Sequence, residues 1–280
     1  MVLFSGLATA LRTDPAEFVI RSWAKVREFP ERWTSSYPYL AQSSWEQMLH
    51  SMLQCELPCP LHELQTPIWD DVQQRLTLKG ITPGPASYLG HNDGDPAFIR
   101  AIWCLIAHLQ ASRIVETGVA HGVTSRFVLE GLARNGGGHL WSIDLPPQTV
   151  SEVHDQIGAA VGEDLRTHWT YIRGSSRRHL PPLLRKIGLI DLFVHDSLHS
   201  EYNMLFELRT AWPHVRPGGA VVVDDIDNNR AFDEFTKAIP EHLSIVCEAE
   251  PLRPDPLRVS RQRPGLFGVI LKNGPARHAV

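Results

Sequence analysis

The stretch RIVETGVAHGVTS, residues 113–125, decides the fold. It opens as a short apolar strand, turns at Gly118, and continues into a helical pattern that runs to Arg134. A strand, a glycine turn and a helix form the first half of a βαβ unit. The spacing E-x-G-x-x-x-G lacks the G-x-G-x-x-G fingerprint of dinucleotide-binding turns. Because Glu116 is acidic, the turn suits a ligand with a cationic amine better than a pyrophosphate.

The same alternation continues toward the C-terminus. Strands that alternate with helices predict right-handed crossovers and a doubly wound, mostly parallel α/β sheet. The last two strands have no helical pattern between them, which predicts an antiparallel hairpin at the edge of a seven-stranded sheet. After the first strand, the expected strands are 139–143, 168–172, 190–194, 220–223, 243–248 and 266–271.

The amino-acid composition of the first part of the chain differs from that of the rest. It contains four of the eight tryptophans, and its helix-like stretches are broken by prolines. The segment Thr82-Pro83-Gly84-Pro85 is typical of a boundary. We therefore expect residues 1–85 to form a helical cap that completes a substrate pocket or a subunit interface. Residues 86–280 are then the ligand-binding domain.

Composition excludes several classes of protein. Lys and Arg total 27 against 31 Asp and Glu, so the net charge of -4 offers no footprint for nucleic acid or an anionic membrane. The longest apolar run, residues 101–109, is too short for a spanning helix. No Lys or Arg precedes the short N-terminal apolar stretch, which argues against a signal peptide. We expect a cytoplasmic protein with no membrane contact.

The cysteines form no dense framework. The chain shows no second Cys/His pair at the spacing of a zinc site near the two cysteines that lie four residues apart. We therefore expect reduced thiols at Cys55, Cys59, Cys104 and Cys247.

Ligands of a doubly wound sheet bind outside the carboxyl ends of the strands. The second expected strand ends at Asp144, whose carboxylate can accept both hydroxyls of a ribose. The third is followed by Gly174, Ser175 and Ser176, which could reach the edge of an adenine. Together with the acidic turn after the first strand, the residues that follow the second and third strands favour an adenosine ligand with a positively charged tail. S-adenosylmethionine fits that description, and NAD fits it less well.

Acidic residues follow the fourth and fifth strands. Asp196 ends one, the pair Asp224-Asp225 ends the other, and neighbouring strands would bring them face to face. Three carboxylates so close repel one another unless a cation lies among them. Oxygen ligands favour magnesium, manganese or calcium over zinc. The sequence therefore predicts a metal site of Asp196, Asp224 and Asp225, with helix capping as the alternative role.

A histidine accompanies this cluster. His199 follows Asp196 by three residues and can reach the same crevice. An unperturbed imidazole pKa near ~6.5 suits a general base at neutral pH. We expect His199 to be catalytic together with Asp196, and His195 to be a hydrogen-bonded core residue at the end of its strand.

Taken together, four motifs resemble the class I S-adenosylmethionine-dependent methyltransferases. The resemblance is greatest to the metal-dependent small-molecule O-methyltransferases, which include macrolide-sugar enzymes, and covers about residues 95 to 275. It implies a Rossmann-like fold and a Mg²⁺ or Mn²⁺ ion that orients the substrate hydroxyls. The motifs are residues 116–125, 142–146, 174–176 and 194–199. The residues expected to bind the cofactor are Glu116, Gly118, Gly122, Ser125, Asp144, Ser175 and Asp196.

The expected function is transfer of a methyl group from S-adenosylmethionine to a hydroxyl of a sugar or other secondary metabolite. We also expect a homo-oligomer that binds no nucleic acid. One alternative is an NAD-dependent oxidoreductase, which the missing G-x-G-x-x-G disfavours. Another is a non-catalytic protein that binds an adenosine ligand, which would need neither the acid cluster nor His199.

Overall fold

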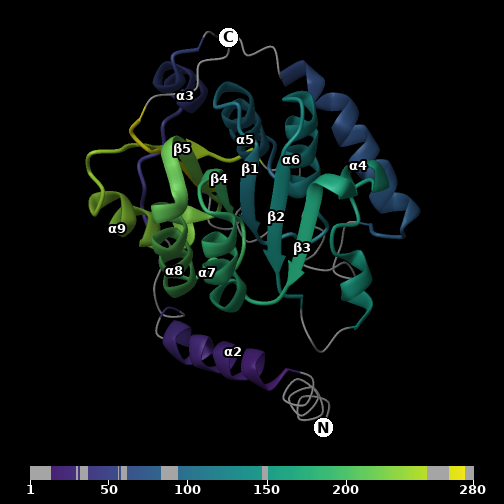
Figure 1. Ribbon diagram of the computed structural model, residues 1–280. Helices are drawn as coiled ribbons and strands as arrows, with labels where there is room; N and C mark the ends of the chain where they lie inside the picture. The colour runs from purple at the N-terminus through teal and green to yellow at the C-terminus, as the bar shows by residue number, and fades with distance from the viewer. Residues whose placement is uncertain are drawn as a thin grey trace.

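The computed structural model describes residues 14–29, 31, 37–55, 57, 62–82, 94–146, 151–250 and 265–274. Its centre is a seven-stranded sheet with helices on both faces, in the order β3-β2-β1-β4-β5-β7-β6 (Figure 1). This arrangement confirms the doubly wound, mostly parallel fold that the sequence predicted. The strands are β1 (Arg113–Thr117), β2 (His139–Asp144), β3 (Trp169–Arg173), β4 (Ile190–His195), β5 (Val215–Val223), β6 (Leu243–Glu248) and β7 (Leu266–Leu271).

The antiparallel strand lies one position in from the edge. β1 to β5 are parallel to one another, whereas β7 pairs antiparallel with both β5 and β6. All six residues of β7 are buried, but β6 exposes half of its residues, as expected for an edge strand. The predicted β6–β7 hairpin is therefore present, and it inserts its second strand between β5 and β6.

Helices pack on both faces of the sheet and bury its apolar residues. Nine residues of α5 are buried, and the helix starts at Pro96, with the side chain of Asp95 accepting the backbone N–H of Phe98 as its N-cap. No described helix has the length and apolar composition needed to cross a membrane. One face carries α3 (Trp45–Leu53), α4 (Thr66–Leu78), α5 (Pro96–His108) and α6 (Val123–Arg134), and the other carries α7 (Ser176–Ile187), α8 (Glu201–Ala211) and α9 (Ala231–Lys237) (Figure 1).

The connection from β2 to β3 contains no α-helix among its described residues. Residues 151–161 form a short 3₁₀ helix, Ser151–Gln156, followed by turns. Gly158 adopts a positive φ of 68°, and a Cβ there would lie 2.3 Å from the Trp169 ring. Glycine is required at this turn, because any side chain on this backbone would meet the aromatic ring of Trp169 in β3.

The N-terminal helices occupy two different places. Trp45 and Leu49 of α3 belong to the same buried core as α5. In contrast, α2 (Pro15–Glu28) lies beyond the carboxyl ends of the strands, at the other end of the molecule (Figure 1). Glu31, just after α2, accepts the first backbone N–H of α8, from Glu201, at 2.8 Å. The predicted boundary at residues 82–85 lies mostly outside the described residues.

Candidate active site

A cavity of about 440 Å³ lies at the carboxyl ends of the central strands, where the sequence predicted a ligand site. The loops after β1, β2, β3 and β4 form its floor and sides, and α2 forms a further wall. Sequence reasoning missed the residues of α2, although their helical spacing could have indicated one shared face. They are Ile20, Arg21, Ala24 and Glu28.

Several residues predicted to bind a cofactor line this cavity. Gly118, Asp144, Ser175 and Asp196 all contribute to its wall. One carboxylate oxygen of Asp144 accepts the backbone N–H of Ala120 at 2.9 Å and a neighbouring N–H at 3.1 Å. Burial raises the pKa of Asp144, although these backbone hydrogen bonds oppose the rise. The carboxyl group is therefore held rigidly at the end of β2.

Three other predicted residues lie behind the cavity wall among the described residues: Glu116, Gly122 and Ser125. Glu116 is fully buried, and one of its oxygens accepts hydrogen bonds from the hydroxyls of Ser125 and Ser142, each at 2.6 Å. Burial raises the pKa of Glu116 to about 8 despite these two donors. The direct contact with a cofactor amine stays a prediction, and this geometry gives it no support.

Gly118 is required by a close approach within the chain. Its φ is 88°, and a Cβ at this position would lie 1.8 Å from the backbone oxygen of Asp196. The Asp196 N–H also donates to the carbonyl of Thr117 at 2.8 Å. The turn after β1 and the loop after β4 are therefore packed backbone to backbone, which places Asp196 beside the predicted cofactor turn.

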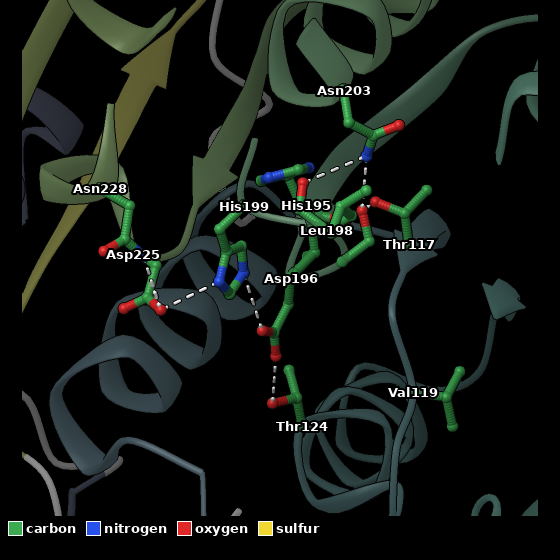
Figure 2. A network of polar contacts seen from close by, with 12 residues as sticks. Thr117, Val119, Thr124, His195, Asp196, Leu198, His199, Asn203, Asp225 and Asn228 are labelled. Carbon is green, nitrogen blue, oxygen red and sulfur yellow. Dashed lines mark hydrogen bonds and ion pairs between the residues drawn. The ribbon is translucent and has the colours of Figure 1, made fainter. Parts of the chain in front are cut away.

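The acidic residues and His199 come together as the sequence predicted. Figure 2 shows the imidazole of His199 between Asp225 on one side and Asp196 on the other. Its Nδ1 lies 2.9 Å from Oδ2 of Asp225, and its Nε2 lies 3.8 Å from Oδ1 of Asp196. The Asp224 N–H donates to the carbonyl of His195 at 2.8 Å, which joins the ends of β4 and β5.

This cluster has a donor set that fits a divalent cation. Within the described part of the chain, Asp196, His199 and Asp224 each offer a ligand atom, and these atoms all lie within 4.8 Å of one another. The Nε2 of His199 is buried and has no hydrogen-bond partner among the described residues. Asp225, predicted as a ligand, instead contacts the other nitrogen of His199. The metal-binding geometry therefore favours Asp224 over Asp225.

Asp225 and its neighbours set the chemistry of the imidazole. When Nδ1–H donates to Asp225, the lone pair of Nε2 faces Asp196 and Asp224. Burial lowers the pKa of His199, but the contact with Asp196 and the charge of Asp224 outweigh it, so the net pKa is raised. His199 lines the cavity and keeps 23% of its side chain exposed. The ring therefore lies at the cavity wall with Nε2 turned toward the two carboxylates.

A buried network behind the loop supports this site. Glu207 of α8 is fully buried and accepts hydrogen bonds from His195, Thr117, Ser197 and Asn203. The His195 contact, at 2.6 Å, confirms the prediction of a hydrogen-bonded core histidine. Sequence reasoning missed Glu207, because a single acid within a helix gives no pattern. Since Ser197 and Asn203 line the cavity, Glu207 positions part of its wall.

Comparisons with known proteins agree with this geometry. Residues 115–226 match the model of a family described as a methyltransferase domain. Among curated proteins, none matches the chain significantly. Together with the fold, the family match confirms the resemblance to class I methyltransferases.

Solved structures provide the comparison of folds. An O-methyltransferase from Bacillus cereus, in complex with SAH, has a TM-score of 0.54 and 15% identity, covering 82% of this chain and 97% of its own. An O-methyltransferase involved in tomaymycin synthesis in Streptomyces achromogenes, in complex with SAM, has a TM-score of 0.54 and 16% identity, covering 74% and 90%. At these identities the likeness establishes the fold.

Proposed function

This chain carries a class I S-adenosylmethionine-dependent methyltransferase domain, and on that premise we propose that it methylates a hydroxyl of a small molecule with a divalent cation, Mg²⁺ or Mn²⁺. The observation that carries this proposal is the cluster of Asp196, His199 and Asp224 beside the cavity. Binding an adenosine ligand alone requires neither the paired carboxylates nor the imidazole. Transfer to an oxygen nucleophile uses both.

The cofactor is proposed to lie along the ends of β1, β2 and β3. Asp144 lines the cavity with a fixed carboxyl group, which suits the two hydroxyls of a ribose. Ser175 lines the same cavity after β3, in reach of the adenine edge. The two solved O-methyltransferases with SAH and SAM support this choice of cofactor. The sulfonium end would then point toward Asp196.

The acceptor hydroxyl must lose its proton as the methyl group is transferred. We assign that proton to Nε2 of His199, with Asp225 holding Nδ1 and orienting the ring. In this assignment Asp196 and Asp224 would hold the cation without His199, because the one lone pair of Nε2 cannot bind a metal and accept a proton at the same time. The cation, when bound, would lower the pKa of a hydroxyl and offset the negative charge that develops on it. The proposed base and the proposed metal ligands thus lie in the loops that follow two neighbouring strands, β4 and β5.

The acceptor is proposed to lie against α2. This helix contributes apolar Ile20 and Ala24 and charged Arg21 and Glu28 to the wall. A wall that presents both apolar and charged side chains suits a hydroxylated sugar or secondary metabolite. In this proposal the N-terminal segment closes the acceptor side of the pocket. The homo-oligomer remains a prediction.

The test separates the roles of metal and base. EDTA should abolish methyl transfer, and added Mg²⁺ or Mn²⁺ should restore it. Asp196→Asn should require much more metal or be inactive, because a ligand is lost. His199→Ala should lose turnover by about 10²–10⁴-fold with cofactor affinity retained.

The control for the histidine variant is His168→Ala, which changes an exposed histidine outside the cavity. Full activity in the presence of EDTA would contradict the proposed requirement for a divalent cation. Recovery of the His199→Ala enzyme at high metal concentration would make His199 a ligand instead of a base.

A further inference from the structure

The helix α2 lies across the starts of two helices, α7 and α8, which pack on one face of the sheet (Figure 1). At the α8 end the contact is complete. The N-cap serine, Ser200, accepts the backbone N–H of Asn203 at 3.2 Å and donates its hydroxyl to Oε1 of Glu28 in α2 at 3.1 Å. Both hydrogen-bonding functions of this serine are therefore used.

The contact at the α7 end is incomplete. The N-cap is again a serine, Ser175, but its side chain makes no capping hydrogen bond. Its hydroxyl oxygen is buried and has no hydrogen-bond partner among the described residues. The backbone N–H of Ser175 lies 3.4 Å from Oε2 of Glu17 in α2. The same residue type is thus fully used at one end of α2 and not at the other.

Glu17 is also incompletely paired. Its side chain is 2% exposed, and Oε2 takes two contacts, the N–H of Ser175 and, at 4.0 Å, Nη1 of Arg178. Oε1 is buried and has no hydrogen-bond partner in the part of the chain that the structure describes. A buried carboxylate oxygen without a donor is unfavourable, because it has lost its hydration. Glu17 therefore offers an acceptor, and Ser175 a hydroxyl, to the polar atoms of a ligand.

Both groups lie at the corner of the cavity that follows β3. Gly174 and Ser175 line the cavity there. Ile20 and Arg21 line it from α2, and they follow Glu17 by three and four residues, so they share its helix face. The proposed cofactor has its adenine at this corner. The edge of adenine presents an amino donor at N6 next to an acceptor at N1. These are the partners that a carboxylate oxygen and a hydroxyl require.

We propose that Glu17 accepts a hydrogen bond from the N6 amino group of the adenine and that the Ser175 hydroxyl donates to N1. The inference rests on the cofactor position proposed above. Glu17 lies behind the cavity wall, and rotation of its side chain brings Oε1 to the base. Helix α2 then recognises the cofactor at one end and borders the acceptor at the other. Glu17 determines specificity in this proposal, because hypoxanthine carries an oxygen where adenine carries the amine, and a carboxylate repels that oxygen.

Calorimetry with two ligands tests this recognition without measuring turnover. S-adenosylhomocysteine and S-inosylhomocysteine differ only in the base, which is adenine or hypoxanthine. The full-length wild type should bind the adenine compound at least about tenfold more tightly, since the other compound exchanges a charge-assisted hydrogen bond for a repulsion. Glu17→Gln should bind the two compounds with similar affinity, because an amide can turn either its carbonyl to the amine or its N–H₂ to the oxygen.

Asp14→Asn is the matched control. Asp14 pairs with Arg178 at the same end of α2 and accepts the backbone N–H of Glu17 as N-cap. Asparagine caps a helix equally well but lacks the charge of the ion pair. This variant should weaken both compounds by the same factor and keep the wild-type preference. The same result in Glu17→Gln, or a wild type without a preference, would overturn this inference alone. A wild type that binds neither compound would overturn the proposed cofactor as well.

Discussion

Two glutamates beside the active site are equally buried and have opposite acid–base behaviour. Glu116 of β1 and Glu207 of α8 are both 0% exposed. The pKa of Glu116 is raised to about 8, whereas that of Glu207 is lowered to about 2. At neutral pH the first is therefore mostly a neutral acid, and the second is a carboxylate.

Their hydrogen-bond partners account for the difference. Burial raises the pKa of both groups. Glu116 receives two hydroxyl hydrogen bonds on one oxygen, and its other oxygen has no hydrogen-bond partner among the described residues. Glu207 faces the imidazole of His195 and also accepts from Thr117, Ser197 and Asn203 on its two oxygens. The number and charge of the donors decide the ionisation, and burial alone does not.

The difference matters for the cavity. A charged Glu207 holds the loop that carries Asp196 and His199. A neutral Glu116 adds no further negative charge behind Asp144 and Asp196, both of which raise its pKa. The carboxyl groups that face the cavity can then serve the cofactor and the cation.

The largest predicted effect concerns the pH dependence conferred by Glu116. Its folded pKa is above the unfolded value, so its contribution to stability is complete below pH of about 4.5 and is lost as pH rises through about 8. The loss amounts to roughly 5 kcal/mol, at ~1.4 kcal/mol per pKa unit between about 4.5 and about 8. Glu116→Gln is neutral throughout and should escape it. Urea unfolding between about pH 5 and pH 9 measures the difference, and parallel profiles for the two proteins would contradict the raised pKa.

Glu207 is predicted to change the stability of the protein with pH in the opposite direction from Glu116. The folded pKa of Glu207 lies below its unfolded value, so its contribution is present above pH of about 4.5 and is lost as pH falls through about 2. Glu207→Gln should cost roughly 3 kcal/mol at neutral pH. In acid unfolding experiments this difference should shrink toward zero. A cost that stays constant with pH would mean that packing, and not charge, is what the variant loses.

The sequence predicted some parts of this site and not others. Asp196 and Asp224 could be predicted as neighbours because the carboxyl ends of adjacent parallel strands meet. The side to which Glu116 points could not be predicted from strand alternation, because residues on both faces of β1 are buried. The contact of Glu207 with His195 depends on how α8 packs on the sheet. The position of α2 over the cavity depends on tertiary contacts in the same way, which no local pattern contains.

A third carboxyl group extends the comparison to ligand binding. Asp144 is the one of these acids that lines the cavity with a proposed ribose. Asp144→Ala should weaken S-adenosylmethionine binding by about 1–3 kcal/mol, because charge-assisted hydrogen bonds are lost. Calorimetry of this variant should be paired with Glu116→Gln, which we expect to bind the cofactor as the wild type does. If Glu116→Gln weakened S-adenosylmethionine binding more than Asp144→Ala did, Glu116 would be a direct contact of the cofactor.

The smallest predicted effect removes one donor from Glu116. Ser125 gives its hydroxyl hydrogen bond to Glu116 at 2.6 Å, and that bond favours the ionised form. Ser125→Ala should therefore raise the pKa of Glu116 further and cost about 1 kcal/mol at high pH. The fall in stability begins near pH 4.5 in both proteins, where the unfolded carboxyl group ionises, but in the variant it should continue to a higher pH, because the folded group holds its proton more tightly. Ser244→Ala, at an exposed position of β6, is the matched control and should leave the profile unchanged. A shift to lower pH in Ser125→Ala would mean that the serine hydroxyl stabilises the protonated acid, and that the two-donor account of Glu116 has the wrong sign.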